Sequence, residues 1–202
     1  MDAATQKKWD KASRNFDFLT WGDDQRLGPH KRRLFSKMNG AILMLAAGTG
    51  NDFRFFPPGH SLIAIDISAK MLERAAEKAK AYEGKIELRQ MDACQLEFAD
   101  NTFDTVVTVC TFCSVPKPVL GLCELRRVLK PGGQLLMFEH VGSRIGPLGV
   151  FLDLMTLLSR RFGPDLNRDT VGNVLKAGFR IRREENVCLD IVKIIEAVKD
   201  RY

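Results

Sequence analysis

Between residues 41 and 138 of this 202-residue chain, continuous apolar runs alternate with segments of helical periodicity. The runs cover residues 41–45, 61–66, 86–90, 105–109 and 134–138. A run without internal alternation predicts a strand buried on both faces, and a strand–helix–strand order predicts parallel pairing with right-handed crossovers. Residues 179–188 and 189–198 follow a helical segment at 168–177 and predict a closing antiparallel strand pair. The chain is therefore predicted to be an α/β fold with a seven-stranded, mostly parallel sheet and helices on both faces.

Length and composition narrow the class of protein. A hydrophobic content of 45% over 202 residues suits one domain. The five cysteines show no regular spacing and the first residues lack the apolar core of a signal peptide, so we expect a cytoplasmic protein with reduced thiols. The formal net charge of +6 leaves nucleic acid, anionic lipid and an anionic cofactor open as partners.

Two features predict a ligand site at the carboxyl ends of the first two strands. Gly48 and Gly50 follow the first strand, where glycine lets the backbone approach a ligand closely. Asp66 ends the second strand, where its carboxylate could accept hydrogen bonds from ribose hydroxyls. Phe53 stands where a dinucleotide fold places its third glycine, so a nicotinamide cofactor is not favoured. A turn that merely requires glycine is the alternative.

Five segments resemble, in family order, the motifs of class I S-adenosylmethionine-dependent methyltransferases: residues 45–51, 65–72, 91–93, 98–107 and 125–133. The subgroup is the methyltransferase type 11, or quinone-methyltransferase-like, one. The resemblance implies a Rossmann-like fold and S-adenosylmethionine as cofactor. It also implies that Asp66 holds the ribose, that the next residue packs on adenine and that Asp92 accepts from the adenine amino group. A helix cap is the alternative role for Asp92. The expected cofactor-binding residues are Phe16, Ala46, Gly48, Gly50, Asn51, Asp66, Ile67, Met71, Asp92, Ala93 and Cys110.

Two positions depart from the family pattern. Ala46 stands where the family usually has glycine, and Met44 stands where it has an acid that helps to hold the methionyl ammonium. Backbone carbonyls near Ala46 and Cys110 could bind the amine instead. The departures also leave open a non-catalytic protein that binds the cofactor and acts through protein contacts.

The acceptor is expected at the ends of the fourth and fifth strands. His140 is the candidate catalytic base, because the pKa of histidine lies near neutral pH; a structural hydrogen bond at the strand end is the alternative. Glu139 could orient His140 or pair with an arginine. Cys110 and Cys113 form a Cys-x-x-Cys pair without a second ligand pair, so packing is expected and no metal site.

Residues 1–40 are expected to form a helical lid over a methyltransferase domain at residues 41–202. Phe16 and Trp21 could belong to this lid or to the core. A basic face carrying Lys7, Lys8, Lys11 and Arg14 could contact anionic lipid or be simply solvated. The apolar residues 145–162 are expected to cover the acceptor or to touch a membrane.

Three shorter segments, residues 53–59, 113–115 and 139–141, resemble membrane-associated thiol S-methyltransferases, as do residues 166–170. The basic, compact chain also resembles bacterial phospholipid N-methyltransferases. We therefore expect methyl transfer to a small lipophilic acceptor, with a phospholipid head-group amine preferred and a thiol or a quinone as alternatives. The expected protein is a monomer without a nucleic-acid partner, in contact at most peripherally with the inner face of an anionic membrane.

Overall fold

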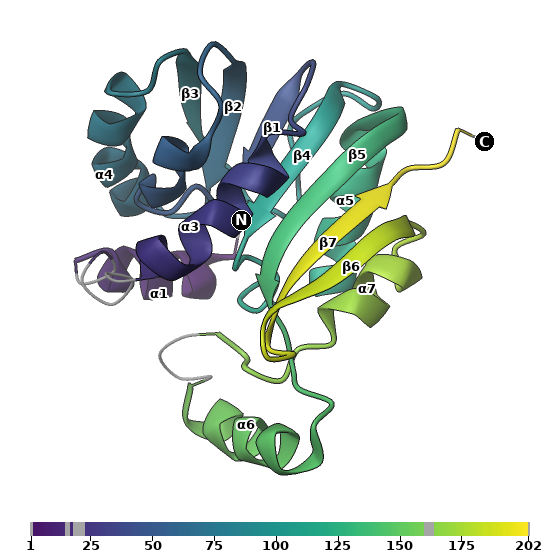
Figure 1. Cartoon of the computed structure of the whole chain (residues 1–202). Coiled ribbons are helices and arrows are strands. Elements are labelled where there is room, and N and C mark those ends of the chain that lie inside the picture. The colour runs from purple at the N-terminus through teal and green to yellow at the C-terminus, as the bar shows by residue number, and fades with distance from the viewer. Residues whose placement is uncertain (1, 15–16, 18–22, 160–163, 202) are drawn as a thin grey trace.

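The sheet of this computed structural model confirms the predicted fold class (Figure 1). The structure describes residues 2–14, 17, 23–159 and 164–201. Seven strands pair in the order β3-β2-β1-β4-β5-β7-β6, and β7 runs antiparallel to both of its neighbours. Their bounds are β1 Ile42–Leu45, β2 Ser61–Asp66, β3 Lys85–Gln90, β4 Phe103–Val109, β5 Leu129–His140, β6 Arg180–Cys188 and β7 Val192–Val198.

Alternate side chains of the buried strands enter two separate cores. Ile42 and Met44 of β1 pack with α3 (Asp23–Phe35), the 3-10 turn η1 (Asn51–Phe55) and α4 (Ala69–Lys80). Leu43 and Leu45 pack on the opposite face with α5 (Pro118–Val128) and α7 (Thr170–Lys176). Because both faces of the central strands are covered, their sequences are apolar without alternation.

The start of β5 differs from the expectation. The apolar run at 134–138 predicted the strand, whereas β5 begins at Leu129 and passes through the proline and glycines of residues 130–133, which favour a turn. Leu129 pairs with Phe103 and Gln134 pairs with Thr105, so the intervening residues form an irregularity in the ladder. Gly132 adopts a φ of 81° there, which glycine tolerates without steric cost.

Two further helices lie at the edge of the sheet where the parallel strands end (Figure 1). They are α1 (Ala3–Ala12) and α6 (Gly146–Ser159). Within residues 1–40, α3 ends against the core, where Leu34, Phe35 and Met38 are buried. The boundary between a lid and a domain at residue 40 stays a prediction. None of the helices in the described ranges has the length and apolarity needed to cross a membrane.

Candidate functional site

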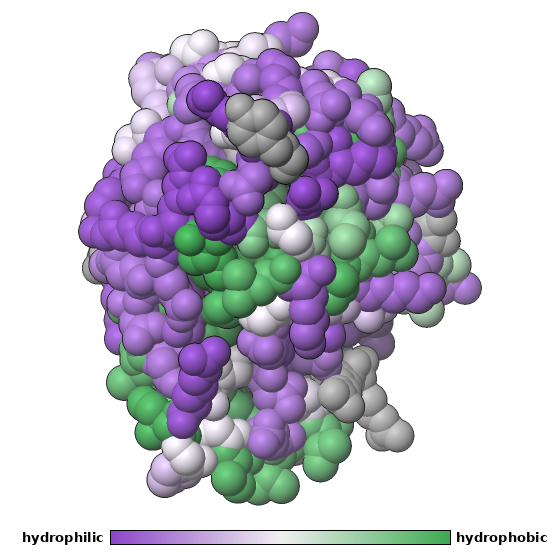
Figure 2. Space-filling view, turned by 90° about the vertical axis from the view of Figure 1, so that its right-hand side faces the viewer, coloured by the Kyte–Doolittle hydropathy of each residue, from purple (hydrophilic) through white to green (hydrophobic). Residues whose placement is uncertain are grey.

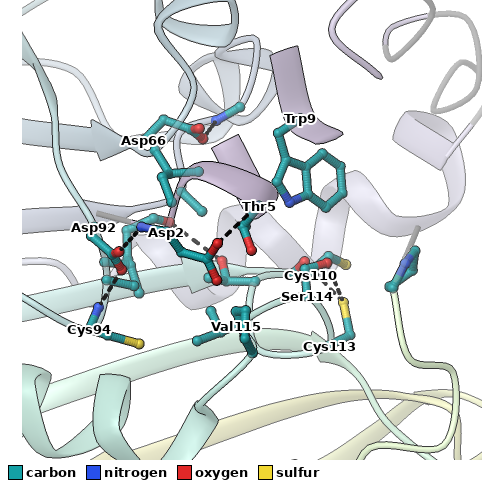
Figure 3. Close-up of a pocket in the computed structure, with 18 of the residues that line it drawn as sticks. Asp2, Thr5, Trp9, Asp66, Asp92, Cys94, Cys110, Cys113, Ser114 and Val115 are labelled. Carbon is teal, nitrogen blue, oxygen red and sulfur yellow. Dashed lines mark hydrogen bonds between the residues drawn. The ribbon is translucent and has the colours of Figure 1, made fainter. Parts of the chain in front are cut away.

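A cavity of about 540 Å³ lies at the carboxyl ends of β1, β2, β4 and β5, under α1 (Figure 3). This volume falls within the range of about 300–1,000 Å³ that is usual for small-molecule sites. Nine of the expected residues contribute to its lining: Ala46, Gly48, Asp66, Ile67, Met71, Asp92, Ala93, Cys110 and His140. The parallel strands thus bring together segments that lie almost a hundred residues apart in the chain.

Asp66 joins the first two motifs at the floor of the cavity. Its Oδ2 accepts a hydrogen bond of 2.9 Å from Gly48 N, and its Oδ1 accepts one of 2.9 Å from Ser68 N. Burial raises the pKa of Asp66, and the two backbone N–H groups oppose that rise without cancelling it. Each carboxylate oxygen keeps a further lone pair for a ligand hydroxyl.

The backbone turns sharply at the ends of β1 and β4. Ala46 has a φ of 53°, Gly48 of 56° and Cys110 of 46°, all in the left-handed region. Glycine adopts this region freely, but alanine and cysteine do so at a cost. Met44, in contrast, is fully buried in the core and contributes nothing to the cavity lining, so no side chain replaces the missing acid at that position.

The start of α1 covers the end of the cavity that lies next to β3. Asp92 Oδ2 accepts a hydrogen bond of 2.9 Å from Asp2 N, and Asp92 Oδ1 accepts one of 2.9 Å from Cys94 N (Figure 3). Thr5 and Trp9 of α1 also line the cavity. Asp92 therefore caps the loop that follows β3 and faces the cavity at the same time.

Further carboxylates fasten the N-terminal segment to the glycine turn and α4. Ser68 Oγ donates a hydrogen bond of 2.5 Å to Asp10 Oδ1. Asp17 accepts from Thr49 Oγ1, from Asn51 Nδ2 at 3.0 Å, and from two cations of α4. Burial raises the pKa of Asp17, but the hydrogen bonds from Thr49 and the neighbouring cations lower it by more, so it lies below the usual value.

Gly50 and Asn51, also expected at the cofactor, lie apart from the nine lining residues. Neither contributes to the cavity lining. Gly50 has a φ of 78° and begins η1, where a Cβ would lie 2.8 Å from the ring of Phe53. The Asn51 amide is used by Asp17 and by Lys78, whose Nζ lies 2.5 Å from Asn51 Oδ1. Phe16 lies outside the described residues, as does Trp21.

Within the part of the chain that the structure describes, Glu139 neither orients His140 nor pairs with an arginine. Its buried carboxylate accepts from Thr108 Oγ1 at 2.6 Å, from Thr111 N at 3.2 Å and from Phe112 N at 3.1 Å. Burial raises the pKa of Glu139 to about 7, despite the opposing hydrogen bonds. Glu139 therefore fixes the loop that follows β4, which forms one wall of the cavity.

His140 lines the cavity at the end of β5. Its Nδ1 is buried and has no hydrogen-bond partner within the described ranges. Burial lowers the pKa of His140, so its imidazole is neutral at neutral pH. β1 and β4 separate β5 from β2, and three strand spacings place His140 about 14 Å from Asp66 across the sheet.

Of the two cysteines in the Cys-x-x-Cys pair, Cys113 has the expected packing role, whereas Cys110 is exposed and lines the cavity. Cys113 is buried, and its Sγ lies 3.2 Å from the carbonyl oxygen of Cys110. Burial raises the pKa of Cys113 to about 12, which keeps this thiol protonated. Within residues 2–14, 17, 23–159 and 164–201, no group of His, Cys, Asp and Glu side chains is arranged to hold a metal ion.

Several lining residues were not anticipated from the sequence. They are apolar or weakly polar, and they come from α1, from the loop after β4, from α5 and from the segment after α6: Thr5, Val115, Leu120 and Leu166. The hydrophobic periodicity of the sequence does not identify such residues as cavity lining, because the segments that carry them are irregular or packed on one side only.

Comparisons with known proteins agree with this geometry. A model of the methyltransferase domain family matches residues 43–137. Phosphatidylethanolamine N-methyltransferase of Cereibacter sphaeroides is 37% identical over 123 residues, which cover 58% of this chain and 61% of that protein. Thiol S-methyltransferase TMT1B of Rattus norvegicus is 32% identical over 176 residues, which cover 80% of this chain and 72% of that protein.

The fold is shared with solved structures. An S-adenosylmethionine-dependent methyltransferase of Thermotoga maritima superposes with a TM-score of 0.73 at 16% identity, covering 97% of this chain and 100% of that one. S-adenosylmethionine is the cofactor that the family implies. The chain belongs to the class I S-adenosylmethionine-dependent methyltransferases.

Proposed function

We propose that this chain transfers a methyl group from S-adenosylmethionine to a lipophilic acceptor, with a phospholipid head-group amine as the preferred case. The observation that carries the proposal is one continuous cavity that joins Asp66 and Asp92 at one end to His140 at the other. Its length along the sheet edge suits a nucleoside at β2 and β3 and a nucleophile at β5.

The residues present fit the cofactor at the first end of the cavity. Asp66 would hold the ribose hydroxyls, and Asp92 would accept from the adenine amino group. Ile67 and Met71 supply apolar surface beside them, and Met71 is buried. Because Met44 supplies no charge, the left-handed turns at Ala46 and Cys110 leave backbone carbonyls as the acceptors for an ammonium group.

S-adenosylmethionine, when bound, supplies an electrophilic methyl group. The protein has to hold the nucleophile in line with it and exclude water, and positioning of this kind accounts for much of the acceleration in two-substrate reactions. His140 would take the proton that the nucleophile loses, because its neutral imidazole has a buried Nδ1 without a partner in the described part of the chain.

A thiol acceptor is the second candidate, favoured by the charges of the lining. The carboxylates among the described lining residues are those of Asp2, Asp66 and Asp92, which belong to the nucleoside end. The described acceptor end thus offers no counter-charge for an ammonium ion. An amine acceptor has to enter neutral, whereas a thiol needs only a base such as His140.

A labelled-methyl assay tests the proposal directly. The panel contains phosphatidylethanolamine in mixed micelles, an alkyl thiol and a quinol, each with wild-type protein and with the His140→Gln variant. We expect transfer to one acceptor class, and a decrease in kcat of about 100-fold or more in the variant. Affinity for S-adenosylhomocysteine, measured by calorimetry, should remain within a few-fold.

Two results would contradict the proposal. Binding of S-adenosylhomocysteine without transfer to any acceptor would indicate a non-catalytic binding protein. Equal rates for the wild type and the His140→Gln variant would remove His140 from the chemistry.

A further inference from the structure

α6 carries an apolar face that no part of the described protein covers. Val150, Phe151, Leu154 and Leu157 are 61%, 57%, 61% and 67% exposed. Their spacing of one, four and seven residues places them along a single side of the helix. Among the α6 side chains whose burial is described, Leu152 and Thr156 are buried, and both lie on the opposite side of the helix.

The exposed face continues beyond the helix itself. Ile145, directly before α6, is 50% exposed, and Leu189 in the turn between β6 and β7 is 64% exposed. Asp190 holds that turn against the start of α6, because Oδ1 accepts from Ser143 Oγ at 2.6 Å and Oδ2 from Arg144 N at 2.7 Å. We call Ile145, Val150, Phe151, Leu154, Leu157 and Leu189 the α6 apolar face.

This face projects from the body of the protein. In Figure 1, α6 hangs below the sheet at the edge where the parallel strands end, and Figure 2 shows hydrophobic surface at this lower end. A convex, protruding set of apolar side chains suits insertion into a lipid bilayer, which can deform around it. A second copy of the chain would have to present a matching concave surface.

The charges around the face complement an anionic partner. Arg144 is exposed beside it. At the same edge of the sheet, Lys7 and Lys11 of α1 and Arg14 just after it are also exposed. The charged residue of α6, Asp153, is engaged by Asn167 Nδ2 at 2.8 Å. With a net charge of +6, the chain is attracted to anionic lipid at long range, and the apolar face then gains by burial.

We propose that the α6 apolar face inserts into the interfacial region of an anionic lipid bilayer and places the cavity mouth at the head groups. The segment that leaves α6 returns Pro164 and Leu166 to the cavity lining, and His140 precedes Ile145 by one short loop. A lipid beside α6 therefore has its head group next to the acceptor end. That docking supplies the lipid acceptor rests on the proposed function.

Vesicle flotation with the full chain tests the docking surface. The probe is vesicles of equimolar phosphatidylglycerol and phosphatidylcholine, with pure phosphatidylcholine vesicles as the charge control. The double variant Phe151→Ser/Leu154→Ser removes the centre of the face without touching a buried side chain. The matched control is Leu175→Ser, which removes a leucine that is 55% exposed on α7, away from α6.

We expect the wild type and the Leu175→Ser variant to float with the anionic vesicles. The double variant should partition at least about tenfold more weakly, since two large apolar side chains no longer enter the bilayer. Thermal unfolding of all three proteins should coincide within a few degrees. Methyl transfer to a water-soluble thiol or amine should be unchanged in the double variant, so a failure of docking is distinguishable from a failure of catalysis.

Equal flotation of the wild type and the double variant would overturn the proposal, as would a wild type that stays entirely with the unbound fraction. Light scattering that shows a dimer for the wild type and a monomer for the double variant would assign the face to a second copy of the chain.

Discussion

The buried carboxylate of Glu139 makes the stability of this protein depend on pH in a direction opposite to that of most acidic residues. Its pKa is raised from 4.5 to about 7 because burial disfavours the charged form. Between these values the native state holds a proton that the unfolded state has lost, so the free energy of unfolding decreases as pH rises. At about 1.4 kcal/mol per pH unit, the interval allows a loss of roughly 3 kcal/mol.

The Glu139→Gln variant removes this titration while keeping the size of the side chain. The amide hydrogens of the new glutamine, which would face Phe112 N, can lower the stability of the variant, but by the same amount at every pH. This constant loss, and the titration of His140 that both proteins share, cancel when the change of stability with pH is compared between the two proteins. Urea unfolding of both proteins from pH 5 to pH 8 gives the comparison. The stability of the wild type relative to the variant should fall by about 2–3 kcal/mol and level off as the pH passes about 7 and approaches 8. A difference that stays constant to within about 0.5 kcal/mol would refute the reasoning.

Three further predictions concern the cavity. The Ala46→Gly variant should be more stable by up to about 1 kcal/mol in urea unfolding, because Ala46 has a φ of 53°; a clear loss of stability would contradict the strain. The Asp66→Asn variant should bind S-adenosylhomocysteine about 10- to 100-fold more weakly in calorimetry, from the loss of charge-assisted hydrogen bonds, whereas unchanged affinity would remove Asp66 from the cofactor site. The acid limb of kcat/KM should lie below pH 6.5 and be absent from the His140→Gln variant, because burial lowers the pKa of His140; a limb at higher pH would assign it to another group.

The fold was predictable because each level of the sequence agrees with it. Residues 41–45 predicted a buried strand and Asp66 the end of the next strand, and the structure confirms both. The start of β5 was not predictable from its local pattern. Lys130 to Gly133 carry turn residues, yet pairing with β4 keeps them within an irregular strand, which is a tertiary effect on a local preference.

Site residues were predictable where they directly follow a strand. They were less predictable where hydrogen bonds to other segments determine the direction of the side chain. Asp66, Asp92 and His140 reach the cavity because parallel strands end at one edge. Asn51 does not line the cavity, because its side chain donates to Asp17, which comes from a part of the chain with no periodic signal. The role of Glu139 differs for a related reason. The backbone N–H groups that donate to its carboxylate, those of Thr111 and Phe112, lie in the loop after the neighbouring strand.

The four donors that converge on Asp17 tie the segment before α3 to two elements at once. Thr49 and Asn51 belong to the glycine turn and its continuation, whereas Arg74 and Lys78 belong to α4. Separating this segment from the cavity would break all these contacts in one event and leave two cations without their shared anion. The loss of these contacts would therefore be cooperative, because the ion pairs of Arg74 and Lys78 share one carboxylate and break together.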